Sequence, residues 1–148
     1  MSTDAKVTRD LIETLRDGEE GFAKVADKLE GSDTPQIGET MRRLSNQRAQ
    51  FRIELDELAK AYDDDVDESG STVAALHRGW IDLKDALTGS SPAHVLKAAE
   101  TGEEHAVSEY DKALDADVSD GLRAVVVRQR NDIVAARDEV KALAAQQS

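Results

Sequence analysis

The 148-residue sequence predicts an all-α protein, an antiparallel four-helix bundle, from three observations. Apolar residues recur every three or four positions over long stretches, which is the spacing of a helix with one buried face. Both prolines, Pro35 and Pro92, stand immediately before such a stretch, where a helix can begin with proline. No alternation of β-branched and polar residues is sustained, so no strand is expected.

The first expected hairpin covers about residues 4–62. Its first helix should run from about Asp4 to Leu29, and its second from about Pro35 to Tyr62. Gly31-Ser32-Asp33 lies between them and should supply the turn. The positions that should face the core follow the helical spacing: Val7, Leu11, Leu15, Phe22, Val25 and Leu29, then Ile37, Met41, Leu44, Phe51, Leu55, Leu58 and Tyr62.

A long connection, about residues 63–91, should join this hairpin to the next. It opens with an acidic stretch that reads as a solvated loop, and a short helix is expected over residues 72–87. Trp80 should anchor this helix on the bundle together with His77 at the edge of its apolar face, although a ligand role for His77 is an alternative. The apolar face consists of Val73, Leu76, Trp80, Leu83 and Leu87.

The second hairpin is expected over about residues 92–146, with helices from about Pro92 to Ala116 and from about Ser119 to Ala145. Short turns within each hairpin make its helices antiparallel, and the long connection allows the chain to cross the length of the bundle. Residues 1–148 should therefore form one domain. Its core-facing positions are Val95, Ala99, Ala106, Tyr110, Ala113, Leu122, Val126, Ile133, Ala136, Val140 and Leu143.

The composition argues against several classes of function. With 31 acidic and 19 basic residues, the formal net charge is −12, which disfavours binding to nucleic acid or to anionic membranes. There is no cysteine, so disulfides and thiol chemistry are excluded. The sequence begins without an apolar run, so neither a signal peptide nor a membrane span is expected, and the cytoplasm is the expected location.

The two hairpins resemble each other in sequence. Gly18-Glu19-Glu20 matches Gly102-Glu103-Glu104 at an offset of 84 residues (103 − 19), and Gln47-Arg48 matches Gln129-Arg130 at an offset of 82 (129 − 47). Two nearly equal offsets in separate helices indicate an old duplication. The glycine before each matched glutamate weakens its helix by up to about 1 kcal/mol and should allow a neighbouring helix to approach closely.

Five polar residues are predicted to point inward and to form a buried polar layer. At about 100° per residue, Glu19 and Glu103 fall inside the apolar stripes of their helices, Arg48 and Gln129 fall near the middle of theirs, and Gln47 falls on the flank. A buried carboxylate must be paired, protonated, hydrated or bound to metal. The same projection places three carboxylates on the opposite side of the first helix: Glu13, Asp17 and Glu20.

Three stretches of the sequence resemble a known family. They are Leu11 to Phe22 (LIETLRDGEEGF), Leu76 to Trp80 (LHRGW) with Leu83-Lys84, and Gly102-Glu103 followed by Ala106 and Tyr110. Together they are similar to a bacterial family of ferritin-like four-helix-bundle proteins that carry a domain of unknown function, over nearly the whole chain. The resemblance implies a ferritin-like bundle, and it implies no established activity.

A ferritin-like di-iron site requires one glutamate from each of two helices and Glu-x-x-His from each of the other two. Glu19 and Glu103 match the lone glutamates, and Glu100 or Glu54 could add a third carboxylate. An inward Arg48 would oppose a bound cation. Iron or manganese is therefore an alternative, and no cofactor is the preferred prediction. The remaining ligand positions contain no histidine and are Gln47, Gln50, Gln129 and Asp132.

The preferred functional interpretation is a structural or stress-associated bundle without catalysis. One alternative is a metal-binding or ferroxidase-type protein with Glu19, Glu100 and Glu103 as ligands. Another is a protein-interaction module that acts as a homo-oligomer, because long amphipathic helices often dimerise and Trp80 could be shared between subunits. Tyr110 also has two interpretations, a redox tyrosine or a core tyrosine hydrogen-bonded to the polar layer, and the second is preferred.

Overall fold

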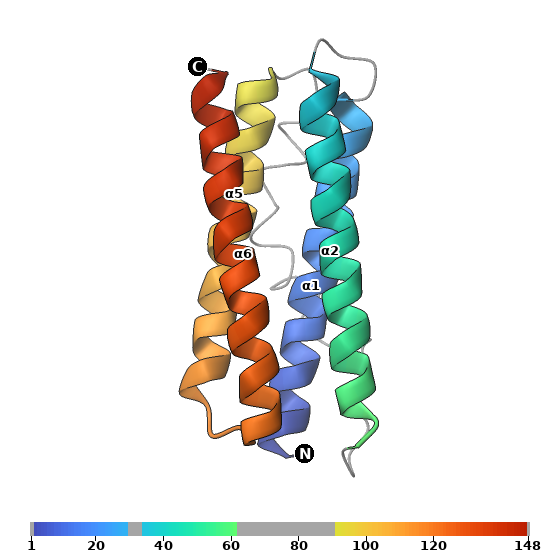
Figure 1. The fold of residues 1–148 in the computed structure, drawn as a ribbon, viewed down its shortest axis with the longest axis vertical. Coiled ribbons are helices and arrows are strands. Elements are labelled where there is room, and N and C mark those ends of the chain that lie inside the picture. Colours follow the sequence, from blue (N-terminus) through green and yellow to red (C-terminus); the bar gives the residue numbers. More distant parts are fainter. Residues whose placement is uncertain (1, 30–33, 62–90, 148) are drawn as a thin grey trace.

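The computed structural model describes residues 2–29, 34–61 and 91–147, and every regular element in these ranges is an α-helix (Figure 1). The helices are α1 (Thr3–Leu29), α2 (Pro35–Ala59), α5 (Pro92–Asp115) and α6 (Asp120–Gln146). The predicted all-α, four-helix fold is confirmed for this part of the chain. Several predictions fall outside the described residues: the turn at Gly31-Ser32-Asp33, the short helix over 72–87, and its anchors His77 and Trp80.

Prolines and serines mark where the helices begin. Pro35 and Pro92 occupy first-turn positions of α2 and α5, where a missing N–H costs no helical hydrogen bond. The hydroxyls of Ser91 and Ser119 each accept a hydrogen bond from the backbone N–H three residues on, at 3.3 and 3.4 Å. These bonds cap the first turns of α5 and α6. At its other end α2 stops at Ala59, a few residues earlier than predicted.

The four described helices form two pairs. α1 packs most extensively on α2, and α5 packs on α6. The pairs meet chiefly through α1 and α5, whereas α2 and α6 share the smallest of these four contacts. α2 and α6 lie at the front of Figure 1 with α1 and α5 behind them, so α2 and α5 occupy opposite corners. α1 begins and α6 ends at opposite ends of the bundle.

Buried apolar side chains form two clusters along the bundle axis. The boundary between the clusters falls between residues 44 and 51 of α2 and between residues 99 and 106 of α5. Arg48 and Glu103 stand midway in these intervals, and both are buried. The centre of the core is therefore polar, with an apolar cluster on either side of it.

The surface of the described residues is predominantly polar. The large apolar side chains most exposed there are Ile53 and Val127. Among the helices in the described ranges, none combines the length and the hydropathy needed to cross a bilayer.

Candidate functional site

A buried ion pair between Arg48 and Glu103 crosses the centre of the bundle. Arg48 comes from α2 and Glu103 from α5, and their side chains are 1% and 0% exposed. Nη1 of Arg48 donates to Oε1 of Glu103 at 2.5 Å, and Nη2 donates to Oε2 at 2.7 Å. This bidentate geometry fixes the orientation of both groups and balances their charges inside the core.

The rest of the Arg48 side chain contacts α1 and its own helix. Its guanidinium carbon lies 5.2 Å from the centre of the Phe22 ring, within the range of a cation–π interaction. Its Nε donates to Oε1 of Gln47 at 3.2 Å. A Cβ built at Gly18 would lie 3.5 Å from both Cγ and Nη1 of the arginine. Arg48 therefore links three of the four described helices.

Gly18 weakens α1 without being required by the packing around Arg48. A methyl group at this position would make ordinary van der Waals contact at 3.5 Å. Because glycine inside a helix costs up to about 1 kcal/mol relative to alanine, we expect G18A to raise the free energy of unfolding by about 0.5–1 kcal/mol. Urea denaturation measures this change, and a loss of stability would show that the close approach does require glycine.

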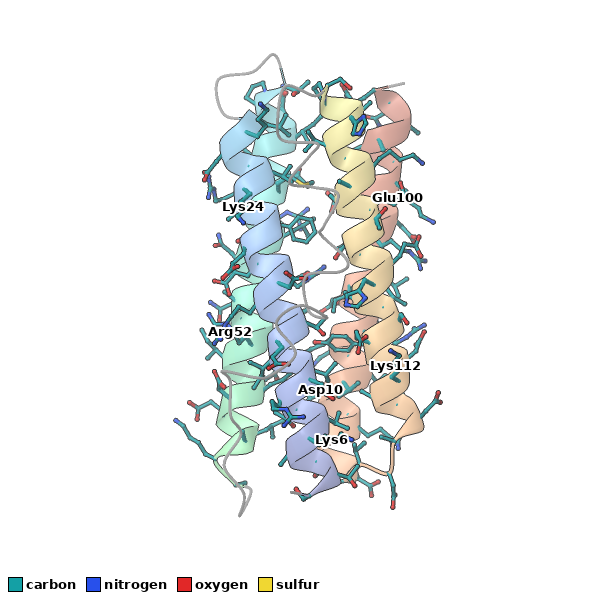
Figure 2. The ribbon with its side chains drawn as sticks, turned by 180° about the vertical axis from the view of Figure 1, so that it is seen from behind. Lys6, Asp10, Lys24, Arg52, Glu100 and Lys112 are labelled. Atoms are coloured by element: carbon teal, nitrogen blue, oxygen red, sulfur yellow. The ribbon has the colours of Figure 1, made fainter. Side chains whose placement is uncertain are left out.

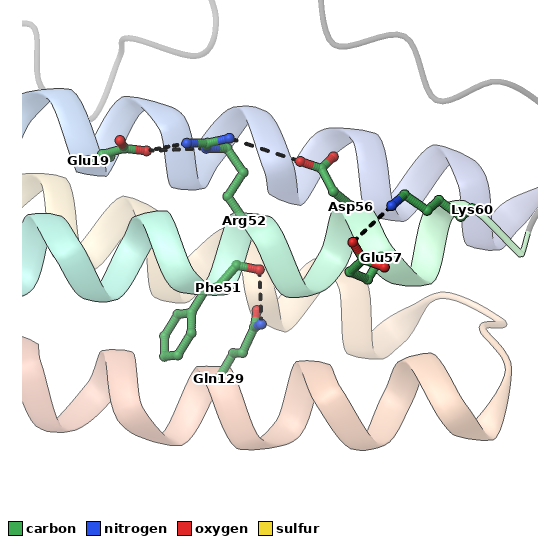
Figure 3. Close-up of polar contacts among 7 residues, drawn as sticks. All are labelled: Glu19, Phe51, Arg52, Asp56, Glu57, Lys60 and Gln129. Carbon is green, nitrogen blue, oxygen red and sulfur yellow. Dashed lines mark hydrogen bonds and ion pairs between the residues drawn. The ribbon is translucent and has the colours of Figure 1, made fainter.

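A second hydrogen-bond network is centred on Gln129 of α6, which is fully buried. The hydroxyl of Tyr110 donates to its Oε1 at 2.7 Å. Its Nε2 donates to Oε1 of Glu54 at 2.9 Å. The same nitrogen donates to the backbone carbonyl of Phe51 at 3.3 Å, the contact drawn in Figure 3. The other carboxylate oxygen of Glu54 pairs with Arg128 at the surface. The network thus runs from a buried phenol to an exposed ion pair.

The polar layer of the structure consists of four buried residues, Arg48, Glu103, Tyr110 and Gln129.

The sequence model of a family described as a domain of unknown function (DUF2383) matches residues 5–116, about three quarters of the chain. The chain belongs to the DUF2383 family. The predicted domain of unknown function is thereby confirmed. A search of curated proteins found no match.

The DUF2383 match covers nearly all of α1 and the whole of α2 and α5, and it ends before α6. Arg48, Glu103 and Tyr110 lie inside the matched region, whereas Gln129 lies outside it. The ion pair of the polar layer is therefore built entirely from the DUF2383 region, and α6 contributes the amide that binds Tyr110.

The environment of Tyr110 in the DUF2383 chain favours a neutral phenol. Burial raises the pKa of the phenol far above its usual value; the positive charge of Arg48 lowers this pKa and the negative charge of Glu54 raises it, both by smaller amounts. The hydroxyl donates a hydrogen bond to an amide oxygen, which is too weak a base to take the proton from the phenol. These contacts support the interpretation of Tyr110 as a hydrogen-bonded core residue.

The raised pKa of Tyr110 makes stability depend on pH at the alkaline end. The folded chain keeps the phenolic proton, while the unfolded chain loses it above pH of about 10, so stability falls as pH rises beyond that value. Between about pH 10.5 and 11.5 we expect the wild type to lose about 1 kcal/mol per pH unit more than Y110F. Urea denaturation across this range measures both slopes, and equal slopes would contradict the prediction.

Glu19 lies outside the polar layer, which corrects the prediction that it is buried there. Its side chain is 30% exposed and accepts hydrogen bonds from Nε and Nη2 of Arg52 at 3.2 and 3.1 Å (Figure 3). The backbone carbonyl of Glu19 accepts a hydrogen bond from the Ser45 hydroxyl of α2 at 2.8 Å, so this residue faces the seam between α1 and α2. A helical projection does not distinguish such a seam from the core.

Gln47 and Glu100 lie at the edges of the bundle. Gln47 is half-buried and accepts the Arg48 Nε hydrogen bond described above. Glu100 is 20% exposed on the face of α5 that Figure 2 presents, with Lys97 Nζ 3.9 Å from its carboxylate. The structure therefore brings three of the predicted residues into the layer, which are Arg48, Glu103 and Gln129.

α1 is buried around more of its circumference than its apolar pattern predicts. Fourteen of its 27 residues are buried, against seven of 27 in α6. Glu13 and Asp17, which the projection places on the outer side, are only 3% and 4% exposed. A projection based on apolar residues assigns every carboxylate outside the stripe to solvent, and it fails where a helix is covered on several sides.

The polar layer of this DUF2383 chain does not fit the di-iron pattern. Both carboxylate oxygens of Glu103 bind Arg48, so a cation there would have to displace a guanidinium. Glu19, the second lone glutamate of the pattern, lies at the surface with Arg52. Within the described ranges, no three histidine, aspartate or glutamate side chains gather as ligands for one metal ion.

Proposed function

We propose that this DUF2383 chain is a non-catalytic structural bundle of ferritin-like topology, in which an arginine stands where ferritin-like enzymes hold metal. The bidentate pair between Arg48 and Glu103 carries the proposal. The guanidinium supplies the positive charge that the buried carboxylate requires, but it offers no coordination position for a substrate and no redox chemistry. Glu103 then has a structural role, as the buried partner of Arg48.

The antiparallel arrangement of the hairpins is part of this proposal. Arg43 pairs with Glu139, and Glu54 pairs with Arg128, so residue numbers rise along α2 as they fall along α6. The 29 residues between 61 and 91 could span up to about 95 Å if extended, and a 25-residue helix such as α2 is about 37 Å long. This length supports a connection that crosses the whole bundle.

In the proposed role, the polar layer specifies how the two hairpins dock. A slip of one helical turn would move Arg48 about 5.4 Å along the axis relative to Glu103. Both charges would then be buried without their partner, at a cost of several kcal/mol. The free-energy difference between the correct register and the registers shifted by one turn is therefore larger than the apolar contacts alone would provide.

Elemental analysis of the full chain after incubation with Fe(II) and, separately, Mn(II) tests the proposal. The wild type, E103A and E19A are compared, each with a circular dichroism spectrum. We expect less than stoichiometric metal in all three proteins. Stoichiometric metal in the wild type that is lost in E19A would overturn the proposal in favour of a ferroxidase-type site. E19A is included because Glu19 is partly exposed, so this variant is expected to fold even if E103A does not.

A further inference from the structure

The last turns of α6 bury smaller side chains than the turns before them. The buried residues of α6 up to position 133 are Leu122, Val126, Gln129 and Ile133. Beyond that position they are Ala136, Val140 and Ala144, and Leu143 is partly buried against the same cluster. We name residues 136–146 the α6 strap. Because the apolar area that a side chain buries grows with its size, the strap is held less strongly by apolar contact than the earlier part of α6.

A cavity of about 370 Å³, open to solvent, lies between α5 and the strap. Its lining comprises Ala93, Lys97 and Glu100 of α5 with Lys141, Ala144 and Ala145 of the strap. Alanine side chains fill little of the space between two helices, and unfilled space lacks the van der Waals contacts of a packed core. The strap is therefore loosely packed on the side that faces α5.

Ion pairs at the surface join the strap to its two neighbouring helices. Glu139 pairs with Arg43 of α2 at 2.7 Å, and the two side chains are 42% and 57% exposed. On the other side, Lys141 and Arg137 lie 3.1 and 4.0 Å from the carboxylate of Glu104 of α5. Exposed pairs of this kind contribute little to stability, and salt screens them.

The part of α6 before the strap has stronger polar contacts. The buried amide of Gln129 bonds to the Tyr110 hydroxyl of α5 and to the backbone carbonyl of Phe51 of α2. Nearer the start of the helix, the guanidinium of Arg123 donates to two carbonyls at the end of α5, at 2.8 and 3.0 Å. These bonds fix the first part of α6 to both neighbouring helices.

We propose that the α6 strap detaches from the bundle as a unit while the polar layer stays closed, so that one end of the bundle can open. The strap lies between α2 and α5, at the red end of α6 in Figure 1. Its departure uncovers apolar side chains of the same cluster, including Met41, Leu44 and Val95. A helical segment of this length is not stable alone in water, so detachment also breaks its backbone hydrogen bonds. This opening is independent of the non-catalytic role proposed above.

Amide hydrogen exchange of the full chain, followed residue by residue by NMR, tests the opening. We expect the amides of residues 140–146 to exchange at least about 100-fold faster than those of residues 126–133. Salt at about 0.5 M should widen this ratio, because it screens the exposed ion pairs of the strap. Fast exchange confined to residues 143–146, with residues 140–142 as slow as residues 126–133, would show ordinary fraying of a helix end and overturn the proposal.

Two matched arginine variants distinguish local opening from global unfolding. R43Q removes the pair between the strap and α2, and should accelerate exchange of the strap amides about twofold or more. R128Q removes the pair with Glu54, which stays intact when only the strap detaches, so the strap amides should exchange at the wild-type rate. Equal acceleration of the strap amides by both variants would show that they exchange only through global unfolding, which would contradict the proposal.

Filling the cavity tests the cause of the opening. A144L places a larger apolar side chain in the cavity and should slow exchange of the strap amides at least about threefold. A124L adds the same side chain at an exposed position near the start of α6, and should leave these rates unchanged within about twofold. Equal effects of the two variants on the strap amides would show that packing against α5 does not control the opening.

Discussion

E103A is expected to lower the free energy of unfolding by about 3–5 kcal/mol, a large fraction of the stability of an ordinary domain. The substitution leaves the Arg48 guanidinium in the core without its carboxylate, and Arg48 is only 1% exposed. A buried charge without a partner loses its hydration and gains no compensating attraction. Urea denaturation followed by circular dichroism measures the change.

Two variants separate the ion pair from general effects of removing a glutamate. E19A removes the equivalent residue of the first hairpin, whose surface pair with Arg52 is worth at most about 1 kcal/mol. R48M/E103L replaces both charges with apolar groups and should recover most of the stability lost in E103A, because it leaves no unpaired charge behind. A loss below about 1 kcal/mol in E103A would show that solvent reaches Arg48 in the folded state.

F22A is expected to cost about 3–5 kcal/mol, for a different reason. Phe22 is fully buried in the apolar cluster on one side of the polar layer, and its ring lies beneath the Arg48 guanidinium at 5.2 Å. Truncation to alanine removes both the packing of the ring and the surface that supports the arginine. Urea denaturation again supplies the measurement.

Comparing F22L with F22A separates the contribution of packing to this loss of stability from the contribution of the cation–π interaction. Leucine retains much of the buried apolar volume and provides no aromatic face, so F22L should retain most of the stability and lose about 1–2 kcal/mol. In the R48M/E103L background, the additional cost of F22L should shrink, since no cation remains above the ring. An unchanged cost in that background would assign the whole effect of Phe22 to packing.

The sequence alone could place Arg48, Glu103 and Gln129 in the core. Each interrupts an apolar stripe and has apolar residues three or four positions away on both sides. Periodicity determines which side of its own helix a residue occupies. It does not determine which residue of another helix lies opposite, because that depends on how the helices are shifted along the bundle axis. The pairing of Arg48 with Glu103 is therefore known only from the structure.

Glu19 shows why the internal repeat inferred from the sequence does not predict the site completely. Glu19 and Glu103 occupy equivalent positions of the repeat, yet they are 30% and 0% exposed. At the offset of 82 residues, Arg52 corresponds to Val134 (52 + 82), so the second hairpin has no arginine at the position from which Arg52 holds Glu19 at the seam. A repeat predicts the position of the backbone, whereas the partner of a side chain depends on residues that have diverged between the two halves.

The polar layer also has a consequence for the lifetime of the folded state. Arg48 and Glu103 are separated by 55 positions in the sequence, and their helices belong to different hairpins. Contacts within a hairpin can form early, whereas this pair can form only when the hairpins dock, late in folding. E103A should therefore accelerate unfolding and leave the folding rate little changed in stopped-flow measurements. One buried ion pair would then determine how long the bundle persists once formed, while the turns and apolar stripes determine how fast it forms.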